Sequence, residues 1–288
     1  MPTATEAPVA GVGAFPGVGD VRGRAKGENF TVASLVLGER NRVCLSAIYG
    51  FARLVDELGD AAPGDRSALL DRAEQELDLA YAGRATDAVF LRLQDAFARC
   101  TLPREEFVRL IDANRRDQRQ PEYETHEDLV DYCRLSANPV GALVLHVFGA
   151  ADAERLRLSD AVCTGLQLVE HWQDVGEDFR NGRIYLPRED RERFGVTDAH
   201  LGAARVDEPL RRLLAFETGR AAELLRAGTR LVHSLRGRAR WAVAGYVGGG
   251  NAAIGALVDA NYEVLPTGPK ASRRRRLLAT LAVLGGRA

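Results

Sequence analysis

Two short acidic segments contain the residues best suited to chemistry. They are Asp56-Glu57-Leu58-Gly59-Asp60 and Asp174-Val175-Gly176-Glu177-Asp178. Each segment sets two aspartates four residues apart, and on a helix this spacing places both carboxylates on one face. Two such faces pointing at each other would supply oxygen ligands for divalent cations, which bridge to the phosphates of a substrate.

The residues around these segments favour a diphosphate site. Tyr49 and Arg53 precede the first segment, and Arg183 and Tyr185 follow the second. Carboxylates for metal together with arginines for phosphate are what such a site needs. The alternative is that the acids lie on solvated helix faces, paired with nearby arginines. We favour the site because both segments end long, mostly apolar helical patterns.

Helical periodicity runs through nearly the whole chain and no alternating strand pattern of any length occurs, which predicts an all-α protein. The expected helices position the acidic segments at the end of the first helix and at the end of the long helix over 153–179. They span residues 30–55, 66–82, 86–99, 103–119, 122–148 with a bend at Asn138-Pro139, 153–179, 208–235 and 238–264, with an irregular stretch at 183–206.

Composition excludes several classes of protein. The chain has 288 residues, 46% of them hydrophobic, and a net charge of −1, so a large core is possible and nucleic-acid binding is not indicated. No stretch reaches the roughly 18 apolar residues of a membrane span. Four widely spaced cysteines without a CxxC pair predict buried free thiols in a reducing, cytoplasmic compartment rather than a zinc site.

Other motifs point away from further cofactors. The early glycines lack the GxGxxG pattern, so we do not expect NADPH to bind, and the absence of a Glu-x-x-His pair argues against a di-iron bundle. Residues 1–25 lack the features of a signal peptide and predict a flexible N-terminus. The main domain is expected at residues 26–266.

Residues 267–288 form an expected basic tail in which Arg273–Arg276 precede an apolar run. Two interpretations remain open. The tail could be a last helix with a solvated basic start, or it could contact an anionic membrane surface at the inner face of the membrane.

Four motifs resemble the squalene and phytoene synthase family. Tyr49-Gly-Phe-Ala-Arg-Leu-Val-Asp-Glu-Leu-Gly-Asp60 resembles its first aspartate motif, and the segment from Leu166 to Pro187 resembles its second. Tyr132-Cys-Arg-Leu-Ser-Ala-Asn-Pro-Val-Gly141 resembles its middle helix. Glu28-Asn-Phe-Thr-Val-Ala-Ser34 resembles the start of the HpnC-type squalene or hydroxysqualene synthase branch of the hopanoid pathway.

The resemblance implies a single-domain isoprenoid synthase fold with a central cavity. In that family the aspartates of the two motifs bind several Mg²⁺ ions from opposite walls, which assigns Asp56, Asp60, Asp174 and Asp178 to the metal. Tyr132 matches an aromatic position in the reaction cavity. The positions matching contacts to the diphosphate or the isoprenoid are Asn29, Phe30, Tyr49, Arg53, Gln167, Gln173, Arg183 and Tyr185.

Two positions depart from the family pattern. Relatives usually carry a metal-binding Asn where this chain has Glu170, four residues before Asp174. We expect Glu170 to bind Mg²⁺ as well, the alternative being that it pairs with an arginine. Many relatives carry Arg where this chain has Gln173, so we expect one phosphate contact fewer.

The implied function is Mg²⁺-dependent ionisation of presqualene diphosphate followed by water capture to give hydroxysqualene. A squalene or phytoene synthase that condenses two farnesyl or geranylgeranyl diphosphates is the alternative. A catalytically inactive family member acting as a partner protein is an alternative of another class. The expected partners are the isoprenoid diphosphate and other enzymes of the hopanoid pathway.

Overall fold

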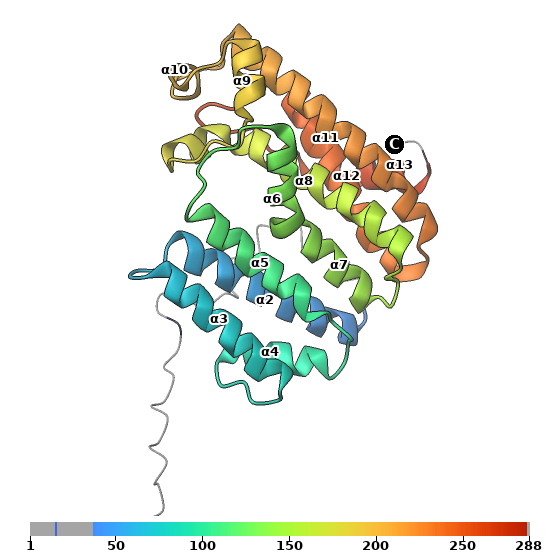
Figure 1. Cartoon of the computed structure of the whole chain (residues 1–288). Coiled ribbons are helices and arrows are strands. Elements are labelled where there is room, and N and C mark those ends of the chain that lie inside the picture. Colours follow the sequence, from blue (N-terminus) through green and yellow to red (C-terminus); the bar gives the residue numbers. More distant parts are fainter. Residues whose placement is uncertain (1–14, 16–36, 287–288) are drawn as a thin grey trace, which may run out of the picture.

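A computed structural model describes Phe15 and residues 37–286, and within these residues the protein is built of α-helices (Figure 1). The all-α prediction is confirmed, because the described residues form no strand and only one isolated bridge, between Glu122 and Ile184. The helices are α2 (Glu39–Asp60), α3 (Arg66–Tyr81), α4 (Ala88–Phe97), α5 (Arg104–Asp117), α6 (His126–Ser136), α7 (Asn138–Val147), α8 (Ala153–Arg180), α9 (Arg188–Phe194), α10 (Asp198–Leu201), α11 (Glu208–Ser234), α12 (Gly237–Asp259) and α13 (Arg273–Leu284).

Side-chain caps start many of these helices where the sequence places Asp, Thr or Ser. The Asp65 and Asp152 carboxylates accept hydrogen bonds from the first turns of α3 and α8. Thr125 and Asp128 form a reciprocal capping box at the start of α6. Such caps satisfy backbone N–H groups that have no partner within the helix, so they fix where each helix begins.

Two apolar cores lie on either side of the molecule's middle. The first packs α2, α3, α4 and α5 together, and the second is centred on α8, α11 and α12. Helix α7 contributes to both, with Leu143 and Val147 in the first core and Leu145 in the second. In Figure 1 the helices of the first core lie below those of the second. An ion pair between Asp60, at the end of α2, and Arg183, just after α8, joins the two halves.

Two of the expected helix boundaries differ from the structure. The expected bent helix over 122–148 is two helices separated at Ala137, because Pro139 cannot donate a backbone hydrogen bond and Ala137, with φ −115°, departs from ideal helix values. The stretch 183–206, predicted to be irregular, contains the short helices α9 and α10. Helix α9 begins after Pro187 and is followed by Gly195 in the left-handed conformation. Because it has only seven residues, its sequence is too short to show helical periodicity between these two turn residues.

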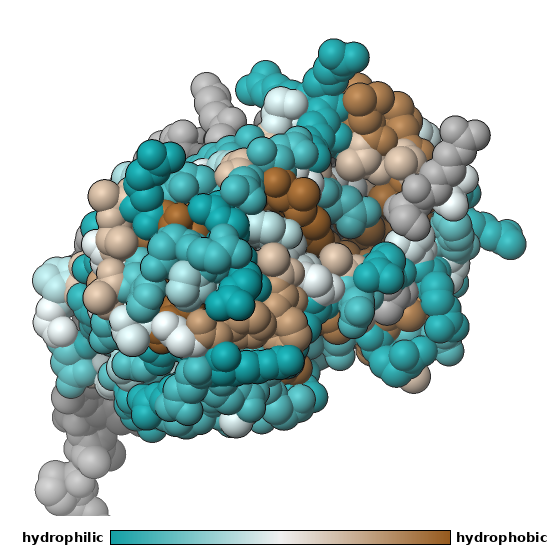
Figure 2. All heavy atoms as spheres, turned by 90° about the horizontal axis from the view of Figure 1, so that it is seen from above, coloured by the Kyte–Doolittle hydropathy of each residue, from teal (hydrophilic) through white to brown (hydrophobic). Residues whose placement is uncertain are grey.

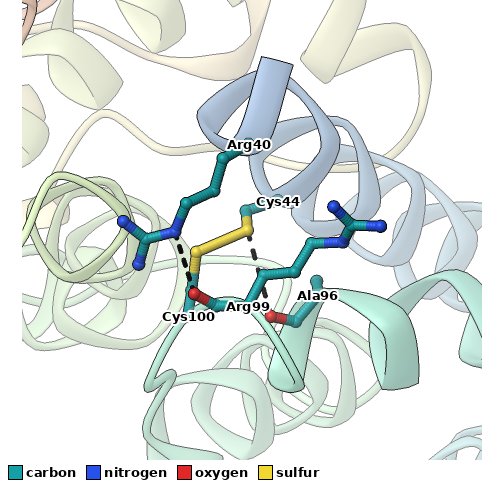
Figure 3. Close-up of a disulfide and its surroundings, with 5 residues drawn as sticks. All are labelled: Arg40, Cys44, Ala96, Arg99 and Cys100. Carbon is teal, nitrogen blue, oxygen red and sulfur yellow. Dashed lines mark hydrogen bonds between the residues drawn. A yellow bond between two sulfur atoms is a disulfide. The ribbon is translucent and has the colours of Figure 1, made fainter. Parts of the chain in front are cut away.

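The expectation of four free thiols is wrong for two of the cysteines. Cys44 of α2 and Cys100 after α4 form a disulfide, while Cys133 and Cys163 are free (Figure 3). The Arg40 side chain donates a hydrogen bond to the Arg99 carbonyl oxygen beside it. Sequence spacing missed the pair because 56 residues separate the two cysteines, and only the packing of α4 on α2 brings them together.

Candidate active site between α2, α5 and α8

One ion pair joins the two acidic segments. Arg183, which follows α8, places its Nη2 atom 2.5 Å from Oδ1 of Asp60 at the end of α2. The two residues are 123 positions apart in sequence. The structure thus brings together two side chains that the sequence assigned to one site, and an arginine suited to phosphate lies directly on a carboxylate suited to metal.

The first segment is held against α5 by a close helix contact. Nδ2 of Asn114 lies 3.4 Å from Oδ1 of Asp56, and Nε2 of Gln118 donates to the Gly59 carbonyl oxygen at 2.8 Å. A Cβ atom at Gly59 would collide with the Asn114 amide, so this approach requires glycine. The Asp56 side chain keeps access to solvent although protein encloses it on most sides, and this burial raises its pKa to about 6.

The second segment places two aspartates one turn apart on α8. Burial and then the charge of Asp174 raise the pKa of Asp178 to about 7, although Arg183 opposes the shift. Burial followed by the charge of Glu177 raises the pKa of Asp174, which Lys270 opposes. The two carboxylates therefore repel each other in a partly desolvated position, where an added cation would stabilise both.

An aromatic wall lies beside these acids. Tyr132 and Tyr185 are buried with ring centroids 5.8 Å apart, and the His171 ring stacks on Tyr185 at 3.7 Å. Nε2 of Gln167 lies 3.2 Å from Nε2 of His171, and this contact orients the amide. His171, which family likeness does not assign to the site, is thus part of its wall, and burial lowers its pKa to about 3, so the ring is neutral.

Asp117 is a site residue that the sequence did not reveal. The Tyr132 hydroxyl donates a 2.7 Å hydrogen bond to its Oδ2 atom. Burial raises the pKa of Asp117 to about 6, with Asp60 adding to the shift and Arg183 opposing it. A single acid next to arginines at the end of α5 forms no recognisable motif. Its position at the end of a helix that also carries the buried Asn114 is only a weak signal.

Other predicted residues lie at the edge of the site. Tyr49 and Arg53 are half-buried on α2, and the Arg53 charge acts on Asp56. The Gln173 amide donates to the Pro269 carbonyl oxygen in the connection between α12 and α13. Glu170 is exposed on α8, and its charge contributes to the raised pKa of Asp178.

Asn29 and Phe30 lie outside the described residues.

A hollow lies between α8 and α12, with its outer part just before the second acidic segment in α8. Its outer part, about 240 Å³, has Glu170 and Gln173 in its lining, and its inner part, about 100 Å³, is almost wholly apolar. Leu166 and Tyr246 line both parts, so the two are neighbours. The inner lining also includes Val140, Val144, Leu145, Val162, Leu231 and Val243. A charged end beside carboxylates and an apolar far end suit a molecule with an anionic head and a hydrocarbon chain.

The donor set matches Mg²⁺ in chemistry. Among the described residues, no three or more Asp, Glu, His or Cys side chains converge on one point. Mg²⁺ does not need such a group, because it is held by one or two carboxylates together with substrate phosphates. The raised pKa values of Asp56 and Asp178 mark carboxylates without enough positive charge around them, which bound Mg²⁺ would supply.

Comparisons with known proteins agree on one family. The profile described as squalene/phytoene synthase matches residues 24–277. A hydroxysqualene synthase of Sinorhizobium fredii is 36% identical over 213 residues, which cover 73% of this chain and 72% of the relative. A phytoene synthase of Mycobacterium tuberculosis is 33% identical over 217 residues, which cover 74% and 71%.

Solved structures give the same result. The squalene synthase HpnC of Alicyclobacillus acidocaldarius superimposes with a TM-score of 0.78 at 48% identity, over 83% of this chain and 91% of that one. A dehydrosqualene synthase in complex with a ligand gives a TM-score of 0.84 at 25% identity, over 92% and 93%. The isoprenoid synthase fold expected from the motifs is confirmed.

Proposed function

The chain belongs to the squalene/phytoene synthase family of enzymes, and we propose on this premise that it converts presqualene diphosphate and water into hydroxysqualene and diphosphate. The observation that carries the proposal is the hollow along α8, whose outer lining holds Glu170 and Gln173, next to Asp174 in the same helix, and whose far end is apolar. Relatives named hydroxysqualene synthase, 35% to 37% identical to this chain, support the choice of reaction within the family.

The chain's own residues have separable tasks in this reaction. Asp56 and Asp60 on one side and Asp174 and Asp178 on the other would hold Mg²⁺, with Glu170 as a further oxygen ligand. Bound Mg²⁺ would neutralise the diphosphate and make it a better leaving group. Arg183, which pairs with Asp60 in this structure, would bind a diphosphate oxygen if Asp60 held metal.

Cleavage of the carbon–oxygen bond leaves its electron pair on the diphosphate and a cation on the hydrocarbon. The rings of Tyr132 and Tyr185 present π-electron density that stabilises such a cation, and the apolar lining limits access of bulk water. A water oxygen then bonds to the rearranged cation and releases one proton, for which the departed diphosphate is the nearest base. The atoms balance as one water consumed for each diphosphate released.

The alternative within the family is condensation of two farnesyl or two geranylgeranyl diphosphates. It is kept because phytoene synthases are 33% identical to this chain and the HpnC structure is titled a squalene synthase. A catalytically inactive partner protein is disfavoured, because all four aspartates of the motifs are present.

Product analysis decides between these reactions. Purified protein with Mg²⁺ should turn presqualene diphosphate into a C30 alcohol without NADPH, as measured by mass spectrometry in parallel with the C15 and C20 diphosphates. Product from geranylgeranyl diphosphate alone, or product only from farnesyl diphosphate with NADPH, would contradict the proposal.

Variants test the metal assignment separately. Asp56→Ala and Asp174→Ala should each lower turnover by at least roughly 100-fold, because each removes an anionic metal ligand. Asp95→Ala, on the exposed face of α4, is the matched control and should retain full activity. Near-normal turnover of either site variant would refute the assignment.

A further inference from the structure

Helix α13 turns its largest apolar side chains to solvent. Leu277, Leu278 and Leu281 are 58%, 55% and 48% exposed, and their spacing places them on one helix face. Arg273 and Arg274 are exposed at the start of the same helix. Surface helices of soluble proteins normally bury their leucines, so this face is the reverse of the usual arrangement.

The packing of α13 on α12 fixes this orientation. A Cβ atom at Gly248 would lie 2.6 Å from Cα of Thr280, so the two helices touch backbone to backbone there. At one end the Arg275 guanidinium pairs with Asp259, and at the other Nη2 of Arg240 donates to the Leu284 carbonyl oxygen at 2.9 Å. Because α13 approaches α12 closely at Thr280, its leucines are left on the outside.

Positive charge lies at both ends of the leucine face. Residues 270–288 contain six basic residues and no Asp or Glu. Arg236 and Arg238 are exposed at the start of α12, near the end of α13 that Arg240 contacts. Figure 2 shows hydrophobic surface open to solvent on the right of the view, the side on which α13 lies.

An indole completes the surface. Trp241 of α12 is 51% exposed, and it directly follows Arg240. Through Arg240, which contacts Leu284, Trp241 lies near the C-terminal end of α13. Tryptophan, arginine and leucine are the residues that interfacial segments place at the boundary between lipid headgroups and acyl chains.

We propose that the surface formed by Arg273, Arg274, Leu277, Leu278, Leu281 and Trp241 docks on an anionic lipid bilayer. Leucines would enter the headgroup boundary while the arginines contact anionic headgroups. A second copy of the chain fits this surface less well. Since arginines lie at both ends of α13, a two-fold contact would bring arginines near arginines whether the helices ran parallel or antiparallel.

The contact is peripheral. Among the described helices, α12 alone has the length and apolar composition of a membrane span. Half of that span is buried, however, because α12 packs between α8, α11 and α13 as a core helix. Docking through α13 leaves this packing intact.

The surface lies close to the hollow. Trp241 is one helical turn before Gly245, which is part of the outer lining of the hollow. A bilayer at Trp241 would therefore lie near the opening through which a hydrocarbon product could pass. The docking surface itself does not depend on the proposed reaction.

The protein carries its own probe for the test. It has two tryptophans, of which Trp172 is fully buried and Trp241 is exposed. Adding vesicles of phosphatidylcholine with about one-third phosphatidylglycerol should shift the fluorescence emission to shorter wavelength, and pure phosphatidylcholine vesicles should do so far less. The variant Trp241→Phe should lose the shift.

Flotation with the same vesicles measures the contributions. Arg273→Gln with Arg274→Gln should lower the partition coefficient by roughly 30-fold. Leu277→Ser with Leu278→Ser should lower it by roughly tenfold or more. The matched control is Leu91→Ser with Arg92→Gln, an exposed pair on α4, which should float like the unmodified protein.

Several results would overturn the proposal. The first is that the unmodified protein does not float with the vesicles. The second is that the leucine variant floats as well as the α4 control. The third is that binding is equally strong with and without anionic lipid. A dimer in sedimentation that the leucine substitutions dissociate, without vesicle binding by the unmodified protein, would assign the surface to a second copy instead. Circular dichroism of each variant checks that the fold is retained.

Discussion

Replacing Asp117 with asparagine should stabilise the protein at neutral pH and slow its reaction. Burial raises the pKa of Asp117 from 3.8 to about 6 in the folded protein. The unfolded chain therefore releases this proton at lower pH than the folded one, so the free energy of unfolding falls as pH rises between these values. The difference corresponds to about 3 kcal/mol in total.

In the variant Asp117→Asn the side chain at this position has no carboxyl proton to release. Its free energy of unfolding relative to the unmodified protein should increase by about 2 kcal/mol between pH 4.5 and 7.5, since part of the effect has already developed at the lower pH. Turnover should fall roughly tenfold, because a neutral amide holds the Tyr132 hydroxyl less firmly than a carboxylate does. We thus expect Asp117 to be a positioning residue that acts through Tyr132.

Equilibrium urea unfolding without Mg²⁺ at the two pH values measures the first effect, and steady-state kinetics measures the second. Asp112→Asn is the matched control, because Asp112 lies on the same helix and pairs with Arg115 at the surface. It should change stability by less than about 1 kcal/mol at either pH. A stability difference for Asp117→Asn that stays constant or shrinks as pH rises would refute the reasoning.

Substitutions at three further positions probe the rest of the molecule. Glu170→Asn should leave an active enzyme whose Mg²⁺ titration is shifted, and an unchanged titration would argue against ligation by Glu170. Arg183→Ala should lower kcat/KM by roughly 10- to 100-fold through loss of a charged hydrogen bond to diphosphate, with Arg183→Lys falling in between; normal kcat/KM would remove Arg183 from the site. Glu217 is fully buried, and desolvation followed by the neighbouring Asp190 raises its pKa to about 8. Glu217→Gln should therefore gain stability relative to the unmodified protein as pH rises from about 4.5 towards 8, with unchanged kcat; urea unfolding that shows no such trend would contradict this.

Local features of the sequence were sufficient to predict the helices and to propose which residues make up the candidate site. The i, i+4 spacing places Asp174 and Asp178 on one face whatever the rest of the chain does, because helical period is a property of the backbone. Capping residues such as Thr125 likewise fix a helix start through hydrogen bonds three residues away. The family resemblance then predicts which wall of the site each acid belongs to.

Only the tertiary structure decided which distant side chains meet. The ion pair between Arg183 and Asp60, the bond from Tyr132 to Asp117 and the Cys44–Cys100 disulfide each depend on how two helices pack, which no local pattern encodes. The same holds for the orientation of α13, whose sequence left open both a last helix with a solvated basic start and a contact with an anionic membrane surface. Contact between Gly248 and Thr280 turns its leucines outward, because backbone approach is possible only where side chains are small.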